Sequence, residues 1–113
     1  MALDWNSALP YLSPRILQRS EVTLLAAMYF PWPEIERAVA VAELESDFNT
    51  SAWDQSGEDS RGLWQINVKA WPQWANWNLF DPTVNAYCAY QVFTKQGWAA
   101  WLNSARKLHI GGY

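Results

Sequence analysis

The chain has 113 residues, half of them hydrophobic and 17% charged, a composition that predicts one folded domain and excludes intrinsic disorder. Its net charge of −3 argues against a nucleic-acid partner, and its longest apolar run is too short to span a membrane. Only one cysteine and one histidine are present, which excludes an internal disulfide and a cysteine-based zinc site and argues against a Ser-His-Asp triad. We therefore expect no metal and no cofactor.

Helical segments are predicted from helix-start residues, prolines and hydrophobic periodicity. Ser13-Pro14 and Asp81-Pro82 each combine a capping residue with a proline suited to the first helical turn. Residues 49–61 are rich in turn formers, and we expect a loop there, with a short hairpin that leads into a strand at 62–67. The predicted class is mainly α (α+β), with a small β-hairpin or loop element around residues 56–67 and helices over about residues 14–28, 33–45, 82–95 and 98–107.

Charge is distributed unevenly along the chain. Residues 1–60 carry ten acids and three arginines, whereas residues 61–113 carry five bases and one acid. Residues 43–59 hold six acids and no base. This acidic stretch is where we look for chemistry.

Glu45 differs from the other acids of the second predicted helix in its position on the helical wheel. At about 100° per residue, Glu36 and Glu43 share a polar stripe. Glu45 instead falls between Ala38 and Val41, at the margin of the apolar face and the end of the helix. Burial and acidic neighbours both raise the pKa of a carboxyl group, and a protonated carboxyl can act as a general acid. The alternative is an exposed glutamate at a frayed helix end.

Two motifs then resemble the active-site signature of the lysozyme-like superfamily. The first closes the predicted helix and reads Glu45-Ser46-Asp47-Phe48-Asn49-Thr50-Ser51-Ala52. The second reads Gly62-Leu63-Trp64-Gln65-Ile66-Asn67, and in that superfamily it lies beneath the sugar chain. The fuller run 57–67 and a set of residues after it most closely resemble phage and bacterial domains of the soluble lytic transglycosylase type. The residues of that set are Leu79-Phe80-Asp81-Pro82, Asn85, Tyr90, Gly97-Trp98 and Trp101. The resemblance covers about residues 35–113.

The resemblance implies a lysozyme-like fold of about five helices, in a single catalytic domain over residues 1–113 whose first 30 residues carry no recognised motif. It implies cleavage of the β-1,4 bond between N-acetylmuramic acid and N-acetylglucosamine in peptidoglycan. Glu45 would be the catalytic acid, as the helical wheel indicates independently. The reaction would be that of a lytic transglycosylase or of a muramidase, which is a hydrolase.

The identity of a second catalytic group stays open. Animal lysozymes place an aspartate two residues before the glycine of the second motif, and here that position is Ser60. Lytic transglycosylases need no second carboxylate, so Ser60 slightly favours that reaction. Asp59, Asp54 and Glu58 keep hydrolysis open, since retaining glycosidases need a second carboxylate. In a regular strand Glu58 shares the face of Ser60, whereas Asp59 points away, and the spacing of Glu45, Asp54 and Ser60 also resembles that of phage lysozymes.

Aromatic and amide side chains are candidates for substrate binding. Strand alternation places Leu63, Gln65 and Asn67 on one face and Trp64 and Ile66 on the other. The resemblance places Gln65 and Asn67 near the sugar and suggests Tyr87 or Tyr90 as a cleft tyrosine. The spacing of the tryptophans makes Trp71 a candidate sugar platform. The full candidate set is Ser46, Gln65, Asn67, Trp64, Trp71, Tyr87 and Tyr90. Most of Trp71, Trp74 and Trp77 are expected to pack around a small core, with one of them at the rim of a cleft. Trp98, Trp101 and Cys88 are expected in the core and His109 at the surface.

A non-catalytic alternative is a component of a phage virion or cell-wall assembly that binds glycan strands with the same cleft. The N-terminus lacks the pattern of a signal peptide, so we expect release by a phage lysis system or delivery with a virion to the bacterial cell wall. The expected partner is peptidoglycan, without membrane insertion, for a monomer or a part of a larger assembly.

Overall fold

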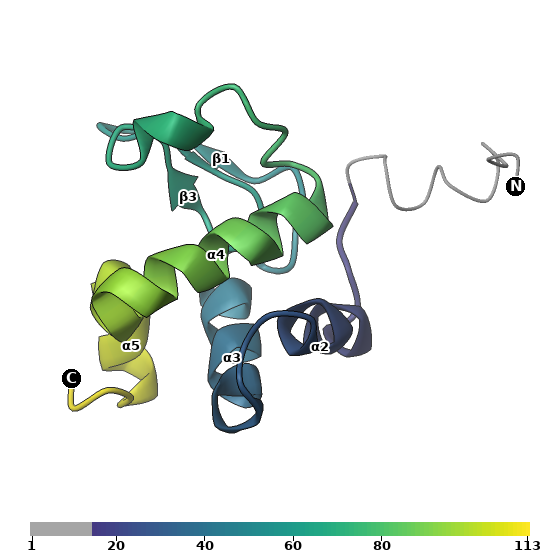
Figure 1. Ribbon diagram of the computed structural model, residues 1–113, viewed down its shortest axis with the longest axis vertical. Coiled ribbons are helices and arrows are strands. Elements are labelled where there is room, and N and C mark those ends of the chain that lie inside the picture. Colours follow the sequence, from purple (N-terminus) through teal and green to yellow (C-terminus); the bar gives the residue numbers. More distant parts are fainter. Residues whose placement is uncertain (1–14) are drawn as a thin grey trace, which may run out of the picture.

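The computed structural model describes residues 15–113, and Figure 1 shows the arrangement of their helices and strands. Helix α4 (Pro82–Gln96) runs through the middle, with a small sheet on one side and helices α2, α3 and α5 on the opposite side. The sheet has three antiparallel strands in the order β1 (Trp53–Asp54), β2 (Ser60–Arg61) and β3 (Ile66–Asn67). The remaining elements are α2 (Arg19–Ala27), η1 (Trp32–Glu34), α3 (Ile35–Ser46), η2 (Pro72–Trp74), η3 (Gly97–Trp101) and α5 (Leu102–Leu108). The mainly α class with a small β element is therefore confirmed.

Helix α4 begins and ends where its sequence signals predicted. The carboxylate of Asp81 accepts hydrogen bonds from the backbone N–H groups of Thr83 at 2.8 Å and Val84 at 3.3 Å. Pro82 occupies the first helical position, where a missing N–H costs nothing. Gly97 ends the helix with a φ of 60°, in the left-handed region that glycine tolerates best. The central element of the fold is thus specified largely by local sequence.

The first predicted helix was wrong at its start. Ser13 and Pro14 lie outside the described residues, and α2 begins only at Arg19. The preceding residues run extended beside the segment that follows α3: the N–H of Leu17 donates to the carbonyl of Phe48, and the N–H of Thr50 donates to the carbonyl of Arg15, both at 2.9 Å. Long-range backbone pairing has therefore replaced the helix that the local pattern predicted.

The regular strand predicted over residues 62–67 was also wrong. Residues 62–65 form turns, Gln65 has a φ of 50°, and only Ile66 and Asn67 belong to β3. Strand alternation fails as a result, because the adjacent residues Leu63 and Trp64 are both fully buried. The predicted hairpin is present as strands β1 and β2, in which Asp54 pairs with Ser60.

Trp64 lies at the centre of the core. Its indole N–H donates to the carbonyl of Ala38 at 2.9 Å, and its own carbonyl accepts the indole N–H of Trp101 at 2.8 Å. Phe30 lies between Trp64 and Trp98, with ring centroids 6.2 Å and 5.8 Å away. The core positions predicted for Trp98 and Trp101 are confirmed. These indoles connect α3, the sheet region and the C-terminal helices.

Cys88 and His109 occupy the positions predicted for them. Cys88 is fully buried in α4, and burial raises the pKa of its thiol to about 12, so it packs as a small hydrophobic residue as predicted. His109 lies at the surface, also as predicted. Within residues 15–113, no helix has both the length and the apolar character required to cross a membrane.

Candidate functional site

Glu45 sits in the last turn of α3, partly buried against α5. The hydroxyl of Ser104 donates to Oε2 of Glu45 at 2.5 Å, and Ser104 itself is only 4% exposed. Burial raises the pKa of the Glu45 carboxyl above its ordinary value, because desolvation disfavours the charged form. The Ser104 bond and the charge of Lys107 act in the opposite direction, whereas Glu58 and Asp54 raise the pKa further. The net effect keeps the proton on Glu45 to a higher pH than on an ordinary glutamate.

A cavity of about 300 Å³ opens in front of this carboxyl group. Its walls come from the end of α3, from the three-stranded sheet and the turn before β3, and from the start of α5 with the end of η3. The lining residues are Glu45, Asp54, Glu58, Ser60, Gln65, Asn67, Ala100, Trp101, Leu102 and Asn103. The structure therefore brings together five of the residues predicted from sequence, besides Glu45 itself.

The hydroxyl and carboxylate groups across the cavity are held by their own hydrogen bonds. The hydroxyl of buried Ser60 donates to Oε1 of Glu58 at 2.7 Å, so these two residues share a face, as strand alternation predicted. Oδ1 of Asp54 accepts from the backbone N–H and the hydroxyl of Ser56. Both bonds favour the charged form and lower the pKa of Asp54. The cavity thus combines a carboxyl group of raised pKa with one of lowered pKa.

Asp59 does not line this cavity. Its carboxylate forms two hydrogen bonds with the Arg61 guanidinium, both at 2.9 Å, and accepts the indole N–H of Trp53 at 2.7 Å. These bonds lower the pKa of Asp59 to about 2. Asp59 is not among the residues that line the cavity of Glu45, and its carboxylate is engaged with Arg61.

Gln65 and Asn67 line two adjoining cavities. The amide N–H₂ of Gln65 donates to the carbonyls of Ala52 and Gly62, both at 3.0 Å, which fixes its orientation in the turn. Both residues also line a neighbouring cavity of about 120 Å³, together with Trp71 from the segment after β3 and with residues of α4. The two cavities share Gln65, Asn67, Ala100 and Trp101. The two cavities are therefore adjacent, and Trp71 lines the one that does not contain Glu45.

Four predicted binding residues lie elsewhere. Trp64 is fully buried in the core, and the hydroxyl of buried Ser46 donates back to the carbonyl of Ala42 at 3.0 Å, so the predictions of substrate contact were wrong for both side chains. Tyr87 and Tyr90 line neither cavity. Tyr90 packs edge-on against Phe30, and Tyr87 lies on the outer side of α4 with 38% of its surface exposed.

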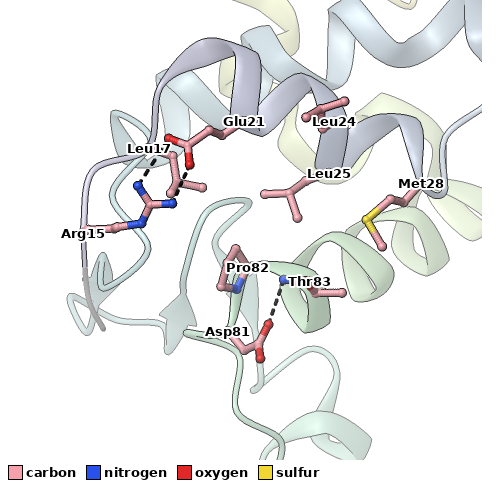
Figure 2. A pocket seen from close by; sticks show the side chains of 9 residues that line it. All are labelled: Arg15, Leu17, Glu21, Leu24, Leu25, Met28, Asp81, Pro82 and Thr83. Carbon is pink, nitrogen blue, oxygen red and sulfur yellow. Dashed lines mark hydrogen bonds and ion pairs between the residues drawn. The ribbon is translucent and has the colours of Figure 1, made fainter. Parts of the chain in front are cut away.

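A separate apolar cavity of about 320 Å³ lies between α2 and the start of α4, and Figure 2 shows the side chains that line it. Leu17, Leu25 and Pro82 line its interior. Glu21 is paired with Arg15, which lowers the pKa of this carboxyl, and Asp81 caps α4. The carboxylates here are engaged in structural contacts, and the cavity shares no lining residue with that of Glu45.

The part of the site that α5 contributes was not predicted from the sequence. Ser104 lies 59 residues after Glu45 and belongs to neither recognised motif. Its only signal in the sequence was a hydroxyl group within the helix predicted over about residues 98–107, a position that many exposed serines share. Within the described part of the chain, no group of three or more histidine, cysteine, aspartate or glutamate residues is arranged to hold a metal ion.

Replacing Ser104 by alanine is expected to raise the pKa of Glu45, because the variant loses a hydrogen bond that favours the carboxylate. If Glu45 acts as an acid, the alkaline limb of the pH–activity profile then moves to higher pH. Looser positioning of the carboxyl group should lower kcat roughly 3- to 10-fold, the worth of one hydrogen bond. The measurement is kcat against pH.

The matched control for this experiment is Ser46→Ala, which removes a buried hydroxyl next to Glu45 that is bonded to backbone instead. This control should leave the alkaline limb in place. An identical shift in both variants, or no shift in Ser104→Ala, would contradict a positioning role for Ser104.

Comparison with protein families agrees with the geometry. Residues 26–103, more than half of the chain, match the model of a family described as a lysozyme-like domain. Comparison with curated proteins gives no match. The matched region contains both motifs and every residue that lines the cavity of Glu45. The chain therefore belongs to the lysozyme-like domain family, whose kind of function is glycoside cleavage in peptidoglycan.

Proposed function

We propose that this protein cleaves the β-1,4 bond between N-acetylmuramic acid and N-acetylglucosamine in bacterial cell-wall peptidoglycan, with Glu45 as the general acid. The observation that carries the proposal is the partly buried Glu45 carboxyl, oriented by Ser104 at the edge of a polar cavity. A raised pKa keeps this group protonated where an ordinary glutamate is ionised, as general acid catalysis requires. Membership of the lysozyme-like domain family supports the substrate class.

Our first candidate reaction is that of a lytic transglycosylase. Glu45 donates its proton to the glycosidic oxygen as the bond to C1 of the muramic acid breaks. The resulting carboxylate then takes the proton from the C6 hydroxyl of the same sugar, whose oxygen bonds to C1 and gives a 1,6-anhydro product without water. Ser60 favours this route, since the position that holds an aspartate in animal lysozymes here carries a buried hydroxyl.

Hydrolysis is the second candidate, and a specific observation supports it. Asp54 and Glu58 line the same cavity as Glu45, and the pKa of Asp54 is lowered. Two carboxyl groups whose pKa values are shifted in opposite directions are the usual arrangement for glycoside hydrolysis. One of these carboxylates would activate a water molecule or stabilise positive charge at C1, and the product would carry a reducing end.

Digestion of purified peptidoglycan in ¹⁸O-labelled water, followed by mass spectrometry, tests both candidates. Anhydro ends without the label identify the transglycosylase, and labelled reducing ends identify the hydrolase. An Asp54→Asn variant should retain the first activity and lose most of the second. If the protein binds peptidoglycan but neither it nor Glu45→Gln releases fragments, the non-catalytic alternative is correct and the proposed reaction is overturned.

A further inference from the structure

The segment between β3 and α4 has an unusual composition. Residues 70–80 contain three tryptophans, three amide side chains and no charged residue. Figure 1 shows this segment as the green loop and short helix above α4. Trp74 is buried and anchors the segment to the core, whereas Trp77 remains 45% exposed. The segment thus presents aromatic and amide groups to solvent without charges between them.

The aromatic rings of this region form a row in which the buried Trp74 lies between Trp71 and Trp77. Trp74 contacts Trp71 on one side and Trp77 on the other, with centroid distances of 5.5 Å and 6.1 Å. Trp77 in turn lies 6.2 Å from Tyr87 of α4, with only 27° between the ring planes. Tyr87 packs edge-on against Tyr29 at 5.7 Å, which supports it from below. We call the two exposed rings, Trp77 and Tyr87, the aromatic ridge.

The ridge differs from the exposed tryptophan on the sheet. Trp53 is 50% exposed, but its N–H donates to Asp59 and the Arg61 guanidinium lies 5.4 Å from its ring centroid. Trp53 therefore belongs to a charged network. Trp77 of the ridge is instead flanked in sequence by two exposed amide residues, Asn76 and Asn78. Flat apolar faces flanked by neutral hydrogen-bonding groups suit a ligand that is itself neutral, with C–H faces and hydroxyl or amide edges.

Given the proposed function, on which this inference rests, we infer that the aromatic ridge is a second glycan-binding surface, outside the cleft that holds Glu45. The ligand class is a β-1,4-linked amino-sugar strand, whose pyranose C–H faces stack on the rings while its hydroxyl and acetamido groups bond to the amides. The position of Trp71 supports a glycan strand as the ligand. The row of rings begins at Trp71, and Trp71 lines the cavity that adjoins the cavity of Glu45. A glycan strand that extends from the cavity of Glu45 past Trp71 would reach the ridge next.

Binding to insoluble peptidoglycan tests the ridge separately from catalysis. The assay uses Glu45→Gln as the parent, so that no strand is cut, and compares it with the same protein carrying Trp77→Ala and Tyr87→Ala. The double variant should bind about 5- to 10-fold more weakly, as expected for the loss of exposed aromatic contacts in a binding surface. The matched control is Trp32→Ala, which removes a tryptophan that is 85% exposed on η1 and has no ring contact with Trp77 or Tyr87. This control should bind like the parent.

A second pair of measurements keeps the outcomes distinct. With Glu45 intact, Trp77→Ala alone should cleave a short soluble glycan fragment at the normal rate and insoluble peptidoglycan more slowly, with an unchanged melting temperature. Equal binding by the ridge variants and the parent would overturn the ridge and leave the proposed function standing. Absence of cleavage by the unmodified protein would overturn the proposed function, while the binding comparison would still decide on the ridge. A loss of binding in Trp32→Ala as large as that in the ridge variants would also overturn the proposed role of the ridge.

Discussion

Replacement of Glu45 by glutamine is expected to lower the rate of peptidoglycan cleavage by at least about 100-fold, because a general acid contributes about 10²- to 10⁴-fold. Glutamine has nearly the same shape and still offers an oxygen to the hydroxyl of Ser104, but it has no proton to donate to the glycosidic oxygen. Fragment release per unit time is the measurement. The control is Glu36→Gln, an exposed glutamate on the same helix, which should retain full activity.

The same variant is expected to be more stable than the unmodified protein at neutral pH. The pKa of Glu45 is raised in the folded state, so its contribution to stability is fully present below the pKa of the unfolded chain. That contribution is lost as the pH rises through the folded pKa, where the buried group ionises at a cost. Glutamine does not titrate, so the stability difference should grow with pH across this window and then level off. Urea unfolding at several pH values measures it, and a less stable variant at neutral pH would contradict this account.

Replacement of Asn85 by alanine is expected to lower the free energy of unfolding by about 3–5 kcal/mol, the largest stability effect we predict. Asn85 is fully buried in α4, where its amide oxygen accepts the N–H of Trp64 at 2.8 Å. Its N–H₂ group donates to the carbonyls of Arg61 and Leu79, also at 2.8 Å. Alanine would leave three backbone groups without these partners, each at a cost of about 1–3 kcal/mol.

Urea unfolding gives the magnitude, with Asn76→Ala as the control. Asn76 is exposed, and its replacement should change stability by less than about 0.5 kcal/mol. The room for Asn85 depends on Gly62, where a Cβ atom would lie 2.3 Å from the amide nitrogen of Asn85. Gly62 also has a φ of 78°, so the close approach and the backbone conformation both require glycine there. A loss of less than about 1 kcal/mol in Asn85→Ala would show that these bonds contribute little.

Local signals in the sequence predicted those parts of the fold that local interactions determine. Asp81 and Pro82 set the start of α4, and hydrophobic periodicity over α3 placed Glu45 beside the apolar face. Periodicity and the motif gave the same residue independently. The central helix and the position of the candidate acid could therefore be predicted from sequence.

Long-range contacts determine the parts that could not be predicted. Trp64 and Gln65 belong to a turn because Asn85, some 20 residues later, fixes the backbone of Trp64 and Arg61. Among the loop acids, the hydrogen bonds of Asp54 with Ser56 and of Asp59 with Arg61 decide which carboxylate faces the cavity. Spacing alone carries no information about these partners.

The extended residues before α2 bear on the length of chain that the folded domain requires. Their backbone bonds hold the segment after α3, in which Asp47 and Phe48 adopt left-handed conformations directly beyond the acid. Arg15 and Leu17 precede residue 26, and Ser104 follows residue 103, so all three lie beyond the stretch that identifies the family. A fragment trimmed to that stretch would keep every motif but lose the backbone bonds of Arg15 and Leu17 to the segment after α3 and the hydrogen bond from Ser104 to Glu45. The contacts that hold Glu45 and the segment after it therefore extend beyond residues 26–103 at each end.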